Sequence, residues 1–256
     1  MRTPEPRAIR TTLGFAAIAV STVFVCGCPS PNSYGTPRTI PARRFSQTIA
    51  AEVVNARGVS TTGTSFTRTL PSTPTYQLRY GVSDRVDIGV RLAHMSTLGG
   101  DVKWNFVRSH RVDVAIDPGI QMMVSPVLGT TAFVTYFNAP VLFGFNVTRK
   151  VTLVPTVGLT YSVSSDALPG TDIRSASGTT GGLARLGFGV NLHLRDRFSI
   201  QPEVTYLRNF DTATRAFVIF GIGMSFGKLP DYDSDDPEIQ AEREASGWSK
   251  NEDSEP

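Results

Sequence analysis

Few side chains in this sequence have the types and spacing that catalysis needs. The chain has three histidines, His94, His110 and His193, and His94 stands two residues before Ser96. A histidine next to a serine is the base and nucleophile pair of many hydrolases. His110 falls in a predicted turn, and His193 is placed to pair with a carboxylate. There is no Gly-Xaa-Ser-Xaa-Gly motif, phosphate-binding loop or metal-ligand spacing, so we expect no catalytic residue, no metal and no cofactor.

Charged residues of the central region form a second group. They alternate with apolar residues and are Arg79, Asp87, Arg91, Asp101, Lys103, Asp113, Asp117, Arg185 and Glu203. A charge-selective pore would favour one sign, but this set mixes both. Because buried charges must be paired, the set favours a network of ion pairs across neighbouring strands. A path for solutes is the second interpretation of the same residues.

Repeated pairs of strands are expected to position these residues. Four turns that contain a basic residue each open an alternating run, at 83–88, 109–114, 148–153 and 195–200. The predicted strands cover 45–55, 75–81, 86–95, 102–107, 112–124, 131–145, 151–163, 183–194, 198–207 and 214–226. Their period of two gives each strand one apolar and one polar face. The pattern predicts an all-β fold, a closed antiparallel up-and-down transmembrane barrel of about ten strands.

The connections between the predicted strands alternate in length. Longer loops are expected at 57–74 and 164–179, and also at 95–100, 124–130 and 208–213, between the four short turns. Outer-membrane barrels place short turns in the periplasm and long loops outside the cell. With ten strands, both ends of the barrel then fall on the short-turn side, so we expect both termini in the periplasm.

In these features residues 45–227 resemble the bacterial outer-membrane β-barrel proteins. The last strand also resembles the assembly signal of that family at Gly221, Met224 and Phe226, with Ile219 where a polar residue is usual. The resemblance implies outer-membrane lipids and the barrel-assembly machinery as partners, and we expect a monomer. Aromatic residues near the strand ends are expected to form girdles at the two interfaces, namely Tyr80, Phe106, Phe145, Tyr161, Phe198, Tyr206 and Phe226.

Three prolines fall inside predicted strands, where each removes a ladder hydrogen bond. They are Pro118, Pro155 and Pro202, and each follows one of the short turns at a similar distance. Since proline in a sheet is mostly confined to edges and bulges, we expect all three positions to be β-bulges.

The N-terminus has the pattern of a signal peptide. Arg2, Arg7 and Arg10 form a basic region, and the apolar stretch over residues 13–25 is short for a spanning helix. We therefore expect residues 1–27 to be removed.

The end of this signal resembles the bacterial lipobox, with Val25, Cys26 and Gly27 before Cys28. The resemblance implies cleavage before Cys28, lipidation of its thiol, and a lipidated tether over residues 28–44. The alternative is an ordinary secretory signal, which would leave Cys28 as a free thiol. Pro29 stands where an Asp would favour the inner membrane, so the resemblance implies the outer membrane.

The C-terminal tail, residues 228–256, is rich in Asp and Glu, with Arg243 and Lys250 among few basic residues. It has too little apolar surface to offset the entropy of ordering, so we expect it to be disordered, with protease cleavage near Pro230. The basic residues of the rest of the chain lie at turns and alternate positions, not in one stripe with aromatics. This distribution argues against binding to nucleic acid.

Three functions remain in view. The first is a lipid-anchored, non-enzymatic outer-membrane barrel with a structural or narrow-pore role. The second is a calyx-like periplasmic lipoprotein with its apolar faces inward around an apolar ligand. The third is a hydrolase of the outer-membrane barrel kind, with His94 near the outer rim.

Overall fold

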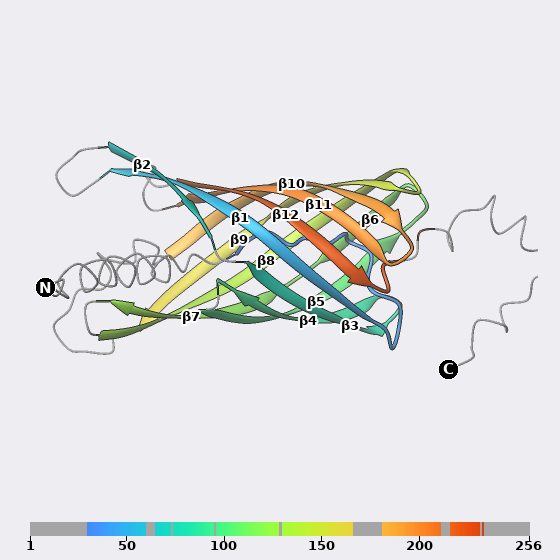
Figure 1. The fold of residues 1–256 in the computed structure, drawn as a ribbon, viewed down its shortest axis with the longest axis horizontal. Helices are drawn as coiled ribbons and strands as arrows, with labels where there is room; N and C mark the ends of the chain where they lie inside the picture. Colours follow the sequence, from blue (N-terminus) through green and yellow to red (C-terminus); the bar gives the residue numbers. More distant parts are fainter. Residues whose placement is uncertain are drawn as a thin grey trace, which may run out of the picture.

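The computed structural model describes residues 30–59, 65–72, 74–94, 96–127, 130–165, 181–210, 216–230 and 232, which form one closed antiparallel barrel (Figure 1). Its strand segments are β1 (Phe45–Val59), β2 (Ser65–Pro71), β3 (Thr75–Ser83), β4 (Val86–Ala93), β5 (Thr97–Arg108), β6 (Val112–Ile116), β7 (Gly119–Val127), β8 (Thr130–Thr148), β9 (Val151–Ser165), β10 (Gly181–Arg195), β11 (Phe198–Asn209) and β12 (Ala216–Gly227). No helix in the described ranges is long and apolar enough to cross a membrane.

These segments make ten strands around the barrel. β2 and β3 pair with successive parts of β1, residues 53–59 and 45–50, and so form one interrupted strand. β6 and β7 are likewise one strand, interrupted at Asp117 and Pro118, because both pair with β5 and with β8. β12 pairs with β1 and closes the barrel. The predicted ten-stranded antiparallel barrel is confirmed.

The two ends of the barrel differ. One, the turn end, carries the four predicted turns between β3 and β4, β5 and β6, β8 and β9, and β10 and β11, together with the start of β1 and the end of β12. The other, the loop end, carries the remaining connections, including residues 166–180 between β9 and β10. The start and end of the barrel thus lie on the expected side.

Some connections at the loop end are shorter than expected. Part of the predicted loop 57–74 is strand β2, whose Thr69 hydroxyl accepts a hydrogen bond from the Asn55 amide of β1 at 2.9 Å. β7 runs to Val127, so residues 128–129 alone join it to β8. β5 begins at Thr97, because residues 97–101 pair with β7. Gly99 lies so close to β7 that a Cβ there would stand 2.7 Å from Gln121 Cγ. The threonines and glycines in these stretches predict loops, but in the structure their backbones pair with neighbouring strands.

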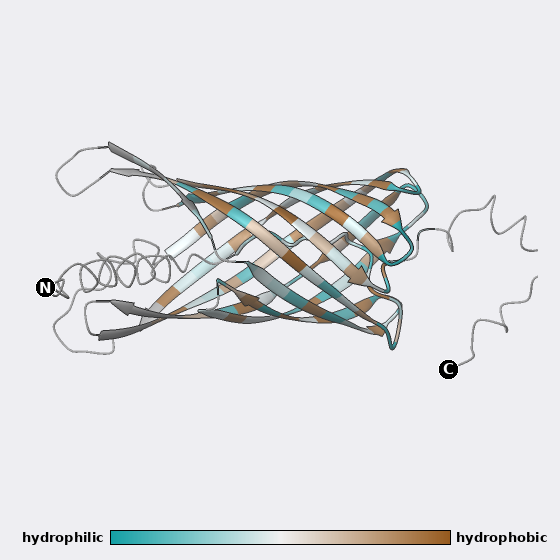
Figure 2. Cartoon of the chain, viewed as in Figure 1, coloured by the Kyte–Doolittle hydropathy of each residue, from teal (hydrophilic) through white to brown (hydrophobic). Residues whose placement is uncertain are grey.

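Side chains alternate between the outer and inner faces along most of each strand. Val90, Phe188 and Phe220 are 55%, 45% and 53% exposed on the outside, while Asp87, Asn105 and Asp113 on the inside are fully buried. Figure 2 shows the alternation as bands of hydrophilic and hydrophobic colour along the coloured parts of the strands. The predicted register is confirmed. The calyx hypothesis is wrong on this point, because the apolar face points outward.

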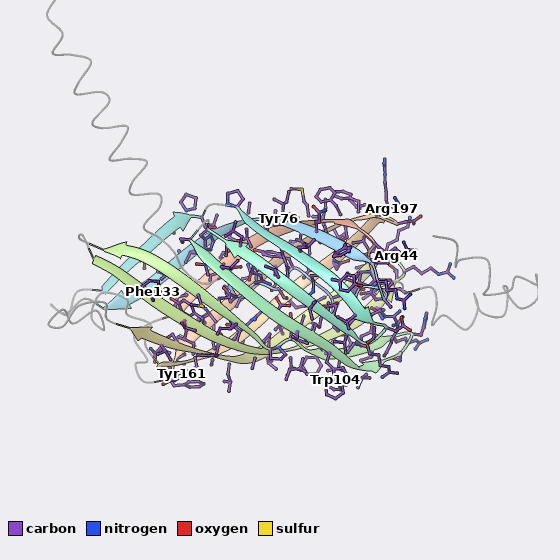
Figure 3. All side chains as sticks on the ribbon, turned by 90° about the horizontal axis from the view of Figure 1, so that it is seen from below. Arg44, Tyr76, Trp104, Phe133, Tyr161 and Arg197 are labelled. Carbon is purple, nitrogen blue, oxygen red and sulfur yellow. The ribbon has the colours of Figure 1, made fainter. Side chains whose placement is uncertain are left out.

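Aromatic rings lie toward both ends of this apolar outer surface (Figure 3). At the turn end Phe45 packs on Tyr80 with ring centroids 4.6 Å apart, and Phe198 packs on Phe226 at 5.1 Å. Tyr161 lies toward the loop end. Amphipathic rings at two levels are typical of a surface that meets both interfaces of a bilayer.

The structure corrects the bulge prediction for all three prolines. At Pro118 pairing stops between β6 and β7, but it resumes in the same register with β8 and with β5, so no residue is inserted. Pro155 in β9 and Pro202 in β11 instead stand in register with β10 and β12. On their other sides, pairing with β8 and β10 stops for two residues and resumes in the same register. The missing N–H therefore opens a gap in one ladder without inserting a residue.

The actual bulges lie at the turn end. Each of the four turns is preceded by a shift of register on its first strand. The shifts fall between Gly81 and Ser83, Asn105 and Val107, Asn146 and Thr148, and His193 and Arg195. The repeated turn motif of the sequence thus corresponds to a repeated bulge-and-turn unit, which increases local twist as the chain reverses.

The outer face provides a direct test of membrane insertion. Phe188→Arg would place a charge at the middle of β10 on the apolar surface, at a cost of about 2–4 kcal/mol near the bilayer midplane. We expect the variant to lose most of the folded, heat-modifiable form on unboiled gels. Asp196→Arg, in the exposed turn between β10 and β11, is the matched control and should assemble normally. Equal assembly of both variants would contradict a lipid-facing position for Phe188.

Candidate functional site

The lumen of the barrel is occupied by the chain itself. Residues 30–40, here called the inner segment, run through the lumen from the loop end toward the turn end (Figure 1). The Ser30 carbonyl accepts hydrogen bonds from Arg91, near the end of β4, at 3.0 Å and from Gln121 of β7 at 3.1 Å. At the other end the Thr39 hydroxyl donates to the carbonyl of Asp84 in the β3–β4 turn. The sequence predicts a tether over residues 28–44; residues 30–40 of this stretch are extended and lie inside the barrel.

The wall holds the inner segment mainly by its backbone. Side chains of the wall donate to the carbonyls of Asn32 (Arg91, 2.7 Å), Gly35 (Gln201, 3.4 Å), Thr36 (Lys103, 3.0 Å) and Pro37 (Asn105, 3.1 Å). The carboxylates of Glu203 and Asp87 accept from the amides of Ser33 (2.9 Å), Tyr34 (2.8 Å) and Ile40 (3.0 Å). The polar lumen therefore satisfies the backbone of a buried, non-sheet segment, as burial requires.

Tyr34 is the main side-chain anchor of the inner segment. It has a left-handed backbone, with φ of 46°, and its hydroxyl donates to Glu52 at 2.7 Å. Its ring lies against β12 at Gly221 and Gly223, where a Cβ on Gly223 would stand 2.7 Å from a ring carbon. A Cβ on Gly221 would overlap the hydroxyl. The two glycines thus form a recess for this ring.

At the turn end the inner segment bends back over the rim to begin β1. Arg43 has a φ of 62°, its amide donates to the carbonyl of Gly81 at 2.7 Å, and the Gly81 amide donates to the Arg44 carbonyl at 3.0 Å. A Cβ on Gly81 would overlap the backbone of Ile40 and Pro41. The glycine thus allows β3 and the bend to approach closely.

The predicted charged residues lie on the inner face, and most are brought together. Arg79 stands 2.6 Å from Asp87, 2.7 Å from Asp101 and 3.2 Å from Asp117, and Lys103 stands 3.2 Å from Asp87. All five belong to β3, β4, β5 and the link between β6 and β7. Such a cluster keeps its charges only because each buried ion has partners of the opposite sign.

The other predicted residues serve the inner segment. Arg91 donates to backbone carbonyls, Glu203 accepts from backbone amides, and Arg185 stands 3.8 Å from Glu203. Asp113 lies nearer the turn end, 2.9 Å from Arg38. The nine residues therefore form one cluster around Arg79 and separate contacts along the inner segment.

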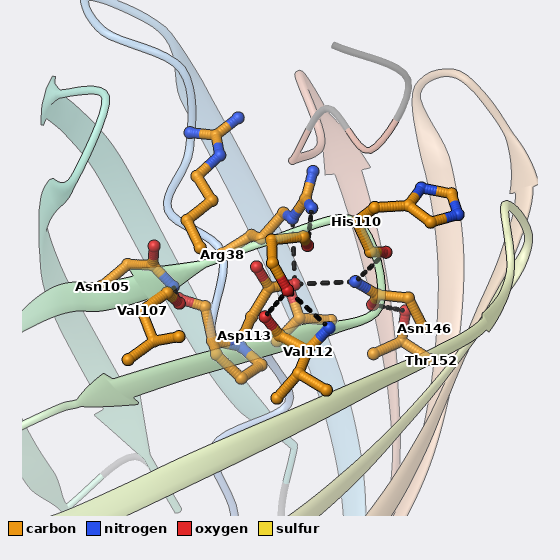
Figure 4. A network of polar contacts seen from close by, with 12 residues as sticks. Arg38, Asn105, Val107, His110, Val112, Asp113, Asn146 and Thr152 are labelled. Atoms are coloured by element: carbon orange, nitrogen blue, oxygen red, sulfur yellow. Dashed lines mark hydrogen bonds and ion pairs between the residues drawn. The ribbon is translucent and has the colours of Figure 1, made fainter. Parts of the chain in front are cut away.

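The turn end of the lumen is closed by side chains from both ends of the chain. Arg38 pairs with Asp113, which also accepts from Asn146 at 2.9 Å, and Thr152 donates to Asn146 at 3.0 Å (Figure 4). Above them the Tyr232 ring lies 4.4 Å from the Arg38 guanidinium carbon, within the range of a cation–π contact.

The beginning of the C-terminal tail is therefore packed. Leu229 is buried, and Tyr232 meets the His193 ring edge-on with centroids 5.3 Å apart. Burial, the largest cause, raises the pKa of Tyr232 to about 12. The predicted disorder from residue 229 onward is wrong for these residues, and a cleavage site near Pro230 would be protected. Residues 233–256 lie outside the described residues, as do residues 1–29 with Cys28 and the predicted signal.

The histidines are placed as follows. His94, with a φ of 52°, points its Nε2 toward Glu52 at 3.4 Å. His110 is exposed in the β5–β6 turn, where its carbonyl accepts from Asn146. His193 packs against Tyr232. Among the described residues no group of three or more His, Cys, Asp or Glu side chains is placed to hold a metal ion.

Sequence reasoning missed Glu52, Arg38 and Tyr34. Glu52 could have been found, because Ile49 and Val53 fix the outward face of β1 and leave residue 52 inward. Arg38 and Tyr34 could not, since the segment that carries them has no periodicity.

No family model and no curated protein sequence matches this chain. Solved structures that it is similar to include Ail, the attachment invasion locus protein of Yersinia pestis, at 10% identity and a TM-score of 0.32, covering 72% of this chain and 99% of that one. The translocator domain of autotransporter NalP from Neisseria meningitidis has 8% identity and a TM-score of 0.41, with 86% and 96% covered. The outer membrane protease OmpT from Escherichia coli has 6% identity and a TM-score of 0.36, with 74% and 97% covered. At these values the likeness carries no argument about function.

Arg79 tests the role of the charge cluster. Arg79→Leu leaves Asp87, Asp101 and Asp117 buried without their shared partner, which we expect to cost about 3–5 kcal/mol. The measurement is the urea midpoint of refolded protein in detergent micelles. Arg79→Lys keeps the positive charge and should lose less. A midpoint unchanged in the leucine variant would show that the cluster does not need Arg79.

Tyr232 gives a pH prediction. Its pKa of about 12 in the folded protein lies above the ordinary value of 10.0. The buried position is therefore favoured fully while the phenol is neutral, below pH 10. The contribution of this burial to stability is lost as the pH rises toward 12, because the unfolded tail ionises more readily. We expect protease protection of residues 229–232 to fall over this window.

Tyr232→Phe is the matched control, because it keeps the ring over Arg38 but cannot ionise. Its protection should stay constant from pH 10 to about 12. The same loss in both proteins would rule out Tyr232 as the titrating group.

Proposed function

We propose that this protein is a non-enzymatic outer-membrane barrel whose lumen is closed by its own inner segment. The observation that carries the proposal is the burial of the lumen wall. Asp87 and Asn105 have no exposed surface and Lys103 is 2% exposed, whereas a water-filled pore would expose all three. The role supported best is structural, and conduction would require the inner segment to move.

The outer surface supports a place in a bilayer. Large apolar side chains are exposed on every strand that spans the barrel, as described for Val90 and Phe188. In water such a surface would cause association, whereas in lipid it needs no cover. A closed barrel has no edge strand, so its backbone groups pair between neighbouring strands except at the gaps beside the prolines, which is the other condition for crossing hydrocarbon.

Basic residues at the turn end support an orientation in which this end faces the periplasm. Arg43, Arg44, Arg197 and Lys228 surround Phe45 in an open hollow of about 420 Å³. Figure 3 shows Arg44 and Arg197 at this end of the barrel. Such a site suits the phosphate groups of anionic phospholipids. Phospholipid contact at the turn end agrees with a periplasmic position for short turns.

The proposal that the protein is not an enzyme rests on His94. The imidazole faces Glu52, and the same carboxylate accepts hydrogen bonds from Ser30 and Tyr34 of the inner segment. The described part of the candidate site thus serves to hold the inner segment. His94→Ala should consequently disturb this packing without removing any hydrolytic activity.

Planar-bilayer recording separates a closed barrel from a pore. We expect the unaltered protein to show no steady conductance, since the inner segment fills the lumen. Replacing both Glu52 and Glu203 by Ala removes the acceptors for Ser30, Ser33 and Tyr34, and should produce transient openings. Steady conductance of the unaltered barrel would contradict the closed lumen.

The matched control replaces the same two residues by Gln, which keeps one acceptor oxygen at each site. It should open less often than the Ala variant. Heat-modifiable migration confirms that both variants form barrels before recording. A protein that stays soluble and monomeric without detergent would instead refute the place in the membrane.

A further inference from the structure

The inner segment has a defined direction. It starts β1 at the turn end and, followed backward along the chain, passes Thr39 beside the β3–β4 turn and Gly35 beside Gln201. It then reaches Ser30 beside Arg91 and Gln121, on the parts of β4 and β7 that approach the loop end. The chain has thus crossed much of the lumen by the time it reaches Ser30.

The lumen has room for one pass of the chain. The recess for Tyr34 requires glycine at 221 and 223, and Gly144 lies so near Pro37 that a Cβ there would stand 3.0 Å from its ring. The cavity beside Ser30 and Pro31 measures about 30 Å³, which is room for one or two water molecules. A chain preceding Ser30 therefore cannot turn back through the lumen to the turn end.

Many hydrogen bonds from the wall go to the backbone of the inner segment and so do not depend on its side chains. Arg91, Gln121, Lys103 and Asn105 all donate to backbone carbonyls, and Glu203 accepts from backbone amides. Backbone groups are the same in every polypeptide, so these hydrogen bonds suit any extended chain. The side-chain contacts of Tyr34 and Arg38 then determine which part of the chain occupies the lumen.

We propose that the lumen is a conduit that carries the protein's own N-terminus through the barrel, so that the chain before Ser30 emerges at the loop end. This inference rests on the proposed function and replaces the expectation that both termini lie in the periplasm. Cys28 is two positions before Ser30, a span of at most about 7 Å along the chain. On this proposal a lipid on Cys28 would be displayed on the loop-end side of the barrel, at the outer face of the membrane. The described start of the C-terminal tail lies at the opposite mouth, where Tyr232 packs on Arg38.

Two epitopes test the proposal in the full chain. One variant carries an epitope with a short Gly/Ser spacer between Pro29 and Ser30, and the matched control carries the same epitope after Pro256. Antibody binding is compared between intact cells and cells with a permeabilised outer membrane. We expect the first epitope to bind fully on intact cells and the second to bind only after permeabilisation. An N-terminal epitope reached only after permeabilisation would overturn the conduit.

The same samples separate this inference from the proposed function. Heat-modifiable migration in the outer-membrane fraction shows that the barrel is present; its loss in the unaltered protein would refute the barrel itself, not the direction of the chain. If the epitope prevents assembly, a single site for a sequence-specific protease replaces it at the same position. Cleavage on intact cells then supports the conduit, and cleavage only after permeabilisation overturns it.

Discussion

The need to fill the lumen governs the rest of this structure. A barrel of about eight strands is just filled by its own side chains, so a ten-stranded barrel encloses more space than its wall can occupy. Here the inner segment takes up that space, and the polar face of each strand is arranged to receive it. Because water is displaced, every charge and every backbone group inside needs a protein partner. Both the Arg79 cluster and the contacts of Glu203 follow from this requirement.

Barrel and inner segment consequently specify each other. Glycines in β3, β8 and β12 face the inner segment at points where a Cβ would collide with it or press against it. In an empty lumen these positions would leave gaps, and the polar side chains opposite would be unpaired. Arg91 shows the same dependence, because it donates hydrogen bonds to the inner segment's carbonyls at Ser30 and Asn32. The wall is therefore suited to an occupied lumen more than to an open one.

The sequence alone predicts the barrel well and the site in part. Alternation at period two identifies the ten strands and the inward register of residues such as Asp87 and Arg185, because each strand has to bury one face whatever its neighbours are. It fails where pairing overrides composition, as in β2 and at Gly99. It also gives no sign of the inner segment. Residues 30–40 have no period, and their contacts exist only once ten strands have closed around them.

The hydrogen bonds in the lumen do not by themselves make the closure permanent. Each is worth about 1 kcal/mol net, and about 1.5–3 kcal/mol where a charged group takes part, because water can replace the partner. If the inner segment moved, water would solvate Glu203, Arg91 and the released backbone, while the Arg79 cluster would keep its pairs within the wall. What water cannot replace is the packing of Tyr34 in its glycine recess and the stacking of Tyr232 on Arg38. These two contacts, one in the lumen and one at the turn-end mouth, therefore add to the hydrogen bonds that hold the inner segment in place.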